Sequence, residues 1–115
     1  MMLPDPLSTI ELDVFKCSDL LSASSPPLLI DCREIQEYEH CKIANSVLVP
    51  LSNFAVILKS IEYSQNLPII VYCHHGVRSL YAVHYLRDAG FNKSFSMAGG
   101  IDQWSVLIDS AIQRY

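Results

Sequence analysis

One cysteine occurs where a reactive thiol is expected. Cys73 directly follows an apolar run, Ile69–Tyr72, and precedes a segment that contains a glycine and an arginine. A strand that passes through a tight turn into a helix directs several backbone N–H groups, and the positive end of the helix dipole, at one point. Such a site lowers the pKa of a thiol from about 8.5, and two units of lowering correspond to about 2.7 kcal/mol. We therefore predict that Cys73 is a nucleophile, with an anionic substrate bound by the residues that follow it: His74, His75, Gly76, Val77, Arg78 and Ser79.

The length of this loop bears on its substrate. Four residues separate Cys73 from Arg78, whereas tyrosine phosphatases use a similar loop with five intervening residues that surrounds a phosphate. A shorter loop makes a smaller cradle that suits a single sulfur atom. The spacing therefore favours sulfur transfer, with a small phosphatase or arsenate reductase as an alternative.

The other cysteines form no C-x-x-C pair, which argues against a structural zinc site. We expect Cys17, Cys32 and Cys41 to pack as small apolar residues, with a resolving thiol for Cys73 as the alternative for Cys32 or Cys41. His74 and His75 are expected to shape the pocket rim. Zinc binding together with Cys73, or a positive charge near pH 6.5, are the alternatives for these histidines.

Short apolar runs alternate with helical patterns along the chain, which indicates right-handed crossovers and a mainly parallel sheet. Predicted strands are Leu28–Ile30, Val47–Val49, Ile69–Tyr72 and Ser94–Met97, with Ile10–Val14 as a fifth candidate that also reads as a helix. Predicted helical segments are a short helix capped by Ser18 over Leu20 and Leu21, a turn over Asp31–Tyr38, Phe54–Ile61 capped by Ser52 or Asn53, Leu80–Ala89 after Ser79, and Asp102–Tyr115.

Composition limits the class of protein. The 115 residues suffice for one domain, predicted over residues 1–115, and 50% are hydrophobic while only 17% are charged. A net charge of −4 argues against nucleic acid and against anionic lipid as partners. No apolar run approaches the roughly 18 residues of a membrane helix, and residues 1–15 contain no Lys or Arg for a signal peptide. These features predict a cytoplasmic protein with free thiols.

The chain resembles a single-domain rhodanese in three blocks. They are Asp31-Cys32-Arg33-Glu34 followed by Glu37-Tyr38, then Cys73-x-x-Gly76-x-Arg78-Ser79, then Gly99-Gly100-Ile101 with Trp104. The resemblance implies an α/β fold, with a small, mainly parallel sheet of about five strands flanked by helices. It also implies a sulfurtransferase that carries sulfur as a persulfide on Cys73, from thiosulfate or a persulfide donor to cyanide, a thiol or a protein. Neither a cofactor nor a metal is implied, and Asp31 and Arg33 are expected to support the loop.

One segment departs from the family pattern. Cys41–Ser46 replaces Gly-His-Ile-Pro-Gly-Ala, and only Ile43 is kept. Asn45 can still adopt the left-handed backbone of a glycine, so we expect the turn to survive. A second hypothesis for function is a non-catalytic rhodanese-like module that binds a partner or senses oxidation through the same thiol.

Overall fold

The computed structural model describes residues 3–60 and 65–115 and has one parallel sheet of five strands in the order β1-β5-β4-β2-β3. The strands are β1 (Glu11–Leu12), β2 (Leu28–Asp31), β3 (Val47–Leu48), β4 (Ile69–Tyr72) and β5 (Ser94–Met97). The helices are α1 (Val14–Leu21), α2 (Ile35–His40), α3 (Phe54–Ser60), α4 (Val77–Asp88) and α5 (Gly100–Leu107), and a short 3-10 helix, η1 (Leu51–Asn53), precedes α3. The predicted α/β class with a parallel sheet is confirmed.

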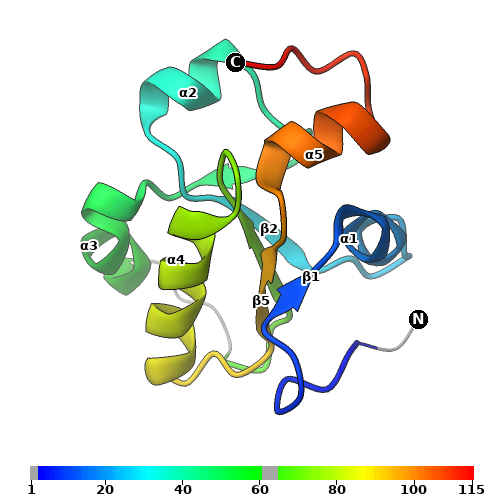
Figure 1. The fold of residues 1–115 in the computed structure, drawn as a ribbon. Helices are drawn as coiled ribbons and strands as arrows, with labels where there is room; N and C mark the ends of the chain where they lie inside the picture. The colour runs from blue at the N-terminus through cyan, green and yellow to red at the C-terminus, as the bar shows by residue number, and fades with distance from the viewer. Residues whose placement is uncertain (1–2, 61–64) are drawn as a thin grey trace.

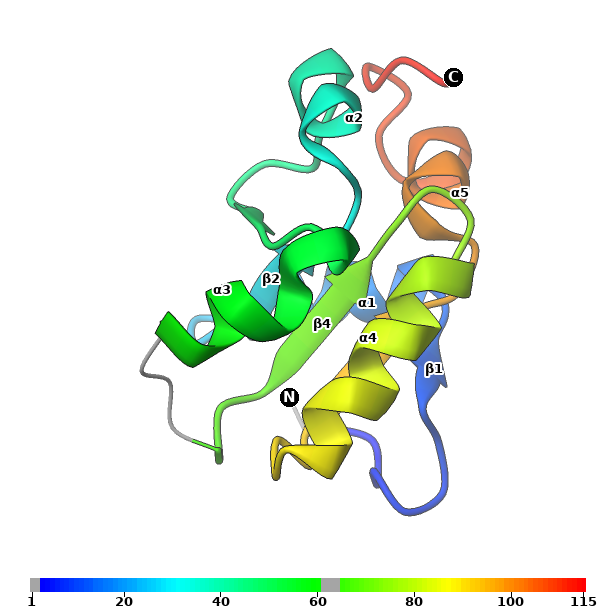
Figure 2. The ribbon, with the colours of Figure 1, turned by 90° about the vertical axis from the view of Figure 1, so that its left-hand side faces the viewer.

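Helices cover both faces of the sheet, with α3 and α4 on one face and α1 and α5 on the other (Figures 1 and 2). Side chains of β4 alternate between the faces: Ile70 and Tyr72 join the core beside α1 and α5, whereas Ile69 and Val71 join the core beside α3 and α4. Cys73 continues this alternation on the α3 and α4 face. Every residue of β4 is buried, as expected of a central parallel strand.

The strand predictions agree closely with the structure. The predicted runs over β4 and β5 have the observed bounds, β2 extends one residue further to Asp31, and β3 ends one residue earlier at Leu48. The segment Ile10–Val14, for which both a strand and a helix were considered, contains parts of both: β1 ends at Leu12 and α1 begins at Val14. The polar residues that alternate with apolar ones in β5 do not form a solvent-exposed face of the strand, since Ser94 and Ser96 are both buried.

Two helix predictions are wrong at their ends. Ser18 does not cap the first helix, because the Asp13 carboxylate accepts a hydrogen bond from the Lys16 N–H at 2.8 Å and starts the helix earlier. The last helix ends at Leu107 and not at Tyr115. There the N–H groups of Ile108 and Asp109 both donate to the Trp104 carbonyl, at 2.8 and 3.0 Å, and the Asp109 carboxylate then takes the Ala111 N–H.

The other helices begin close to their predicted positions. The turn predicted over Asp31–Tyr38 starts later, because Asp31 ends β2 and Glu34 caps α2 through a capping box with Glu37. Ser52 lies in η1 and its hydroxyl donates to Glu34, while the predicted helix end at Ile61 lies outside the described residues. Helix α4 begins at Val77, two residues before Ser79.

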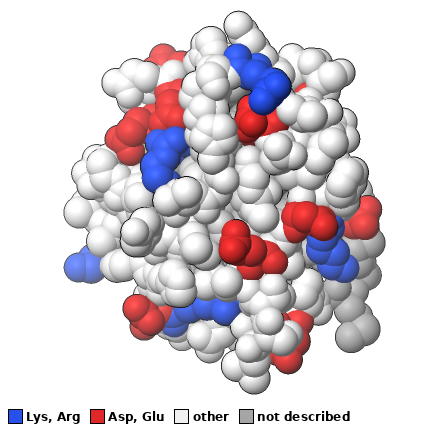
Figure 3. Space-filling model, in the orientation of Figure 1, with Lys and Arg blue, Asp and Glu red and all other residues white. Residues whose placement is uncertain are grey.

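The surface carries charges of both signs. Figure 3 shows acidic and basic groups interspersed over one face, without a continuous basic area. Among the helices in residues 3–60 and 65–115, none has the length and apolar character to cross a bilayer.

We predict that Asp13→Ala lowers the free energy of unfolding by about 1 kcal/mol, because the first turn of α1 loses its side-chain acceptor. Ser18→Ala is the matched control, since Ser18 lies inside the helix and its replacement should change stability by less than about 0.5 kcal/mol. Urea unfolding followed by circular dichroism measures both variants. Equal losses in the two variants would contradict Asp13 as the cap.

Candidate active site

Cys73 lies at the carboxyl end of β4, beside the equivalent position of β2. Asp31 and Tyr72 are register partners in these strands, and the Cys32 N–H donates to the Tyr72 carbonyl at 3.0 Å, which extends the pairing by one residue. Cys32 and Cys73 therefore stand next to each other, and both belong to the core on the α3 and α4 face. Cys32 is fully buried and Cys73 is 1% exposed.

Several hydrogen-bond donors converge on the Cys73 sulfur. The Gly76 and Ser79 N–H groups donate to Sγ at 3.1 and 3.4 Å, and the Ser79 Oγ lies 3.5 Å away. The Cys32 thiol adds a further hydrogen bond from the neighbouring strand. These donors can stabilise a negative charge on the Cys73 sulfur, and the binding of an anionic substrate by the loop stays a prediction.

These donors lower the pKa of Cys73 to about 4. The hydrogen bond from Cys32 is the largest cause, burial opposes it, and the bonds from Ser79 and Gly76 follow. The same interaction, together with burial, raises the pKa of Cys32, which therefore keeps its proton and acts as the donor. Cys73 is thus the thiolate of the pair at neutral pH, because the loop donors point at its sulfur.

The Ser79 hydroxyl is itself held by a second buried serine. Its Oγ lies 2.7 Å from the Ser96 Oγ of β5, and both side chains are fully buried. If Ser96 donates to Ser79, the Ser79 proton is free to point at the Cys73 sulfur. The sequence alone does not indicate that Ser96 belongs to the site, because only the pairing of β4 with β5 brings it there.

Two glycines permit the close packing of this loop. Gly76 has a φ of +102° at the start of α4, and a Cβ there would lie 3.1 Å from the Gly99 nitrogen. Gly100 has a φ of +59°, and a Cβ there would lie 2.4 Å from the carbonyl oxygens of both Cys73 and His74. Those carbonyls accept from the N–H groups of Ile101, at 2.9 Å, and Asp102, at 3.1 Å, in the first turn of α5. The Gly-Gly block thereby fixes the backbone at Cys73 and at the residue that follows it.

Arg78 is paired with an acidic side chain of α2. Its Nη1 and Nη2 donate to Glu37 Oε1 and Oε2 at 2.6 and 2.8 Å, which is a bidentate geometry. The Arg78 guanidinium is the largest cause that lowers the pKa of Glu37 to about 2. The positive charge of Arg78 thus lies at the loop but is paired with Glu37, and the binding of an anionic substrate by Arg78 stays a prediction.

Asp31 and Arg33 form a fully buried ion pair with Oδ2 and Nη2 2.7 Å apart. Arg33 also donates to the Cys41 carbonyl at 2.6 Å and to the Tyr115 hydroxyl at 2.9 Å. These contacts connect the end of β2 with the segment at Cys41 and with Tyr115, and a supporting role toward the Cys73 loop stays a prediction. They also hold the segment that departs from the family pattern, where Asn45 has the expected left-handed φ of 67°.

The remaining loop residues form one wall of the site. The His74 ring stacks on His75 and on Tyr115, each with centroids 3.9 Å apart, and its buried Nε2 has no partner among the described residues. The His75 Nδ1 lies 4.0 Å from an Asp102 oxygen. A hollow of about 400 Å³ adjoins this wall, lined by His75, Gly76, Val77 and the outer face of α4. In the described ranges, no group of three His, Cys, Asp or Glu side chains is placed to hold a metal ion.

Comparison with known proteins identifies similar chains. A family model described as "Rhodanese-like domain" matches residues 16–107. A thiosulfate sulfurtransferase GlpE from Pseudoalteromonas translucida is 31% identical over 87 residues, 76% of this chain and 81% of that protein. An "Adenylyltransferase and sulfurtransferase uba4" from Ogataea parapolymorpha is 30% identical over 94% of this chain, which spans only 28% of that protein. A rhodanese-like domain protein from Staphylococcus aureus has the same fold, with a TM-score of 0.78 and 24% identity over 93% of this chain and 99% of that chain.

We predict that Cys32→Ala raises the pKa of Cys73 by about 1–2 units, because a hydrogen bond to a charged group is worth about 1.5–3 kcal/mol. Alkylation of Cys73 by iodoacetamide as a function of pH, read by peptide mass spectrometry, gives this pKa. Cys32→Ser should restore most of the shift, since a hydroxyl also donates. Cys17→Ala is the control, because Cys17 is equally buried but lies on the other face of the sheet, and this variant should leave the pH profile of alkylation unchanged. A pH profile of Cys32→Ala that matches the wild type would contradict the role of Cys32.

Gly100→Ala should lower the free energy of unfolding by about 2 kcal/mol or more and slow alkylation of Cys73 at pH 6, because the new Cβ displaces the carbonyls that fix the loop. Gly90→Ala is the control: Gly90 also has a positive φ, of +96°, but the atoms nearest to its Cβ would belong to the Gln65 side chain and not to the Cys73 loop. That variant should lose stability and keep the reactivity of Cys73. Retained reactivity in Gly100→Ala would show that the Gly-Gly block does not position the thiolate.

Proposed function

Because this chain belongs to the rhodanese-like domain family, we propose that it is a sulfurtransferase that carries sulfur on Cys73. The observation that carries the proposal is the set of donors around the Cys73 sulfur, which stabilises a negative charge within an almost fully buried site. A thiolate held in this way is a nucleophile at neutral pH. The proposed donor is thiosulfate or a persulfide, and the proposed acceptor is cyanide, a thiol or a protein.

In the first step, the Cys73 thiolate attacks the outer sulfur of thiosulfate. A bond forms between the two sulfur atoms, the S–S bond of thiosulfate breaks, and sulfite leaves with the electron pair of that bond. The product is a Cys73 persulfide whose terminal sulfur carries the negative charge. In this proposal the N–H groups of the loop from His74 to Ser79 stabilise that charge, as an oxyanion hole stabilises a negative oxygen.

In the second step, a nucleophile attacks the terminal sulfur of the persulfide. With cyanide, a C–S bond forms, the S–S bond breaks, and thiocyanate leaves while Cys73 returns to its thiolate. The donors to Cys73 Sγ serve as leaving-group stabilisation here, since the departing thiolate is the form that they favour. Within this scheme the sulfur travels on the protein and electron pairs balance without a cofactor.

The position of Cys32 favours one second candidate, a sensor of oxidants. A peroxide would oxidise the Cys73 thiolate to a sulfenic acid, and attack by the Cys32 sulfur would then release water and form a disulfide. The neighbouring strand positions of the two cysteines suit this bond, because adjacent strands lie within the Cα separation of disulfides. The raised pKa of Cys32 opposes it, because a buried protonated thiol attacks slowly.

Two measurements test the proposed function. The protein mixed with thiosulfate and cyanide should release thiocyanate, and intact-mass spectrometry after thiosulfate alone should show the gain of one sulfur atom. Cys73→Ser should abolish both, since a serine hydroxyl at neutral pH is not ionised. Cys41→Ser is the control: Cys41 is the one partly exposed cysteine of the four, and its replacement should leave both signals intact.

Thiocyanate release that survives in Cys73→Ser would overturn Cys73 as the sulfur carrier. A protein that gains no sulfur from thiosulfate or from a low-molecular-weight persulfide, and loses two hydrogens on treatment with peroxide, would support the oxidant sensor in its place. Hydrolysis of an aryl phosphate would support the phosphatase alternative, which the loop length disfavours.

A further inference from the structure

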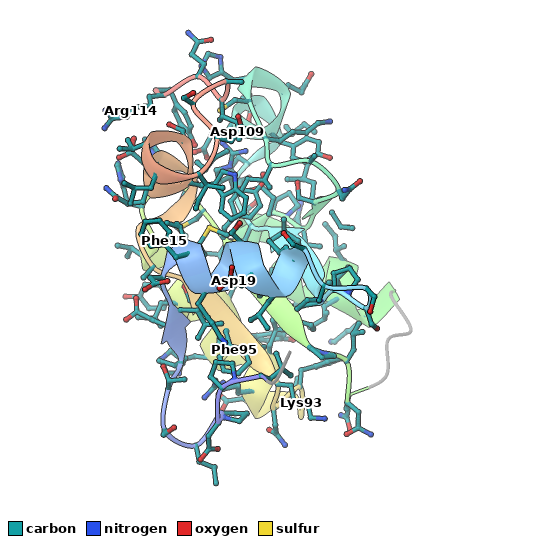
Figure 4. The ribbon with its side chains drawn as sticks, turned by 90° about the vertical axis from the view of Figure 1, so that its right-hand side faces the viewer. Phe15, Asp19, Lys93, Phe95, Asp109 and Arg114 are labelled. Atoms are coloured by element: carbon teal, nitrogen blue, oxygen red, sulfur yellow. The ribbon has the colours of Figure 1, made fainter. Side chains whose placement is uncertain are left out.

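Residues 109–115, called the strap below, run from the end of α5 across the molecule to α2, above the loop that carries Cys73 (Figures 1 and 2). The strap contains neither helix nor strand and lies beyond the family match, which ends at residue 107. Its base is anchored where Ile112 packs against the core. Arg114, labelled in Figure 4 with Asp109, pairs with Asp102 at 2.8 Å.

Tyr115 makes specific contacts at the far end of the strap. Its ring lies on the His74 ring with centroids 3.9 Å apart and planes only 7° from parallel. Its hydroxyl donates to Glu37 Oε2 at 2.6 Å and accepts from Arg33 Nη1 at 2.9 Å. A tyrosine that is 41% exposed thus uses both its ring and its hydroxyl on residues of the site.

These contacts place Tyr115 at both flanks of the reactive loop. His74 adjoins Cys73 in the chain, and Glu37 is the carboxylate that holds Arg78 on the other side. The Cys73 residue between these flanks is 1% exposed. Tyr115 therefore lies beside the loop that carries the buried sulfur and contacts residues on both sides of it.

We propose that Tyr115 is a specificity-determining residue. While Tyr115 contacts His74 and Glu37, the strap is closed: small anions reach Cys73, and bulky thiol or protein acceptors do not. The part of this proposal that concerns sulfur acceptors rests on the proposed function. A bulky acceptor reaches the persulfide only when Tyr115 leaves His74 and Glu37. The strap can open in this way because irregular segments held by solvent-accessible side-chain contacts unfold locally at low cost, and the Arg114 side chain is 63% exposed.

The first test measures access to Cys73 without requiring any sulfur transfer. The rates of Cys73 modification by N-ethylmaleimide and by fluorescein maleimide are compared at one pH, with Cys73 read by peptide mass spectrometry. The ratio of the two rates cancels any change in the thiolate fraction. Tyr115→Ala should raise the bulky-to-small ratio by about tenfold, the factor that corresponds to about 1.4 kcal/mol of lost closure. Tyr115→Phe keeps the ring on His74 and should give a smaller rise.

Tyr85→Ala is the matched control, because Tyr85 is 39% exposed and lies on the outer part of α4 against Phe54. Its ratio should equal that of the wild type. An unchanged ratio in Tyr115→Ala, or an equal rise in Tyr85→Ala, would overturn the proposal. The ratio decides this even if the protein transfers no sulfur, so failure of the strap and failure of the proposed function are distinguishable.

A second test applies to the transfer reaction. In Tyr115→Ala, kcat/KM for a bulky thiol acceptor such as glutathione should rise relative to kcat/KM for cyanide, again by about tenfold. A merely structural role would lower both values together. A constant ratio between the two acceptors would contradict Tyr115 as a determinant of specificity.

Discussion

A buried sulfur anion requires enough hydrogen-bond donors to replace the water that it has lost, and the structure around Cys73 meets this requirement. Burial raises the pKa of a thiol, and for Cys17 on the other face of the sheet burial, followed by the negative charge of Asp13, raises the pKa to about 12. At Cys73 the donors from Cys32, Ser79 and Gly76 exceed that penalty. The difference between these two buried cysteines therefore comes from the loop and the neighbouring strand.

A loop that directs its N–H groups at the sulfur directs its carbonyl groups away from it, and those carbonyls need hydrogen-bond donors of their own. The Cys73 and His74 carbonyls accept from the first turn of α5, where N–H groups have no partner within the helix. One helix end thus stabilises the backbone of the loop while another, that of α4, faces the sulfur. The approach is so close that only a glycine fits at residue 100. This explains in physical terms why a Gly-Gly pair accompanies the cysteine loop in this sequence.

Local signals predicted most of the fold and part of the site. The apolar runs at Ile69–Tyr72 and Ser94–Met97 specify strands by themselves, and the glycine after Cys73 marks the turn, so these features could be read from sequence. The contact of Cys32 with Cys73 depends on which strands are neighbours, and the pairing of Glu37 with Arg78 joins residues 41 positions apart. Neither follows from a local pattern. The strap was mistaken for helix because its course is set by contacts of Arg114 and Tyr115 with distant residues.

We infer that the fold holds Cys73 as a thiolate at neutral pH. Thiolate absorbance near 240 nm, recorded as a pH titration of the wild type minus that of Cys73→Ser, measures this ionisation directly. The structure predicts that the difference signal is fully developed at pH 7 and disappears only as the pH falls through about 4. A midpoint near the ordinary thiol value of about 8.5 would contradict it, and would mean that the loop donors do not stabilise the anion.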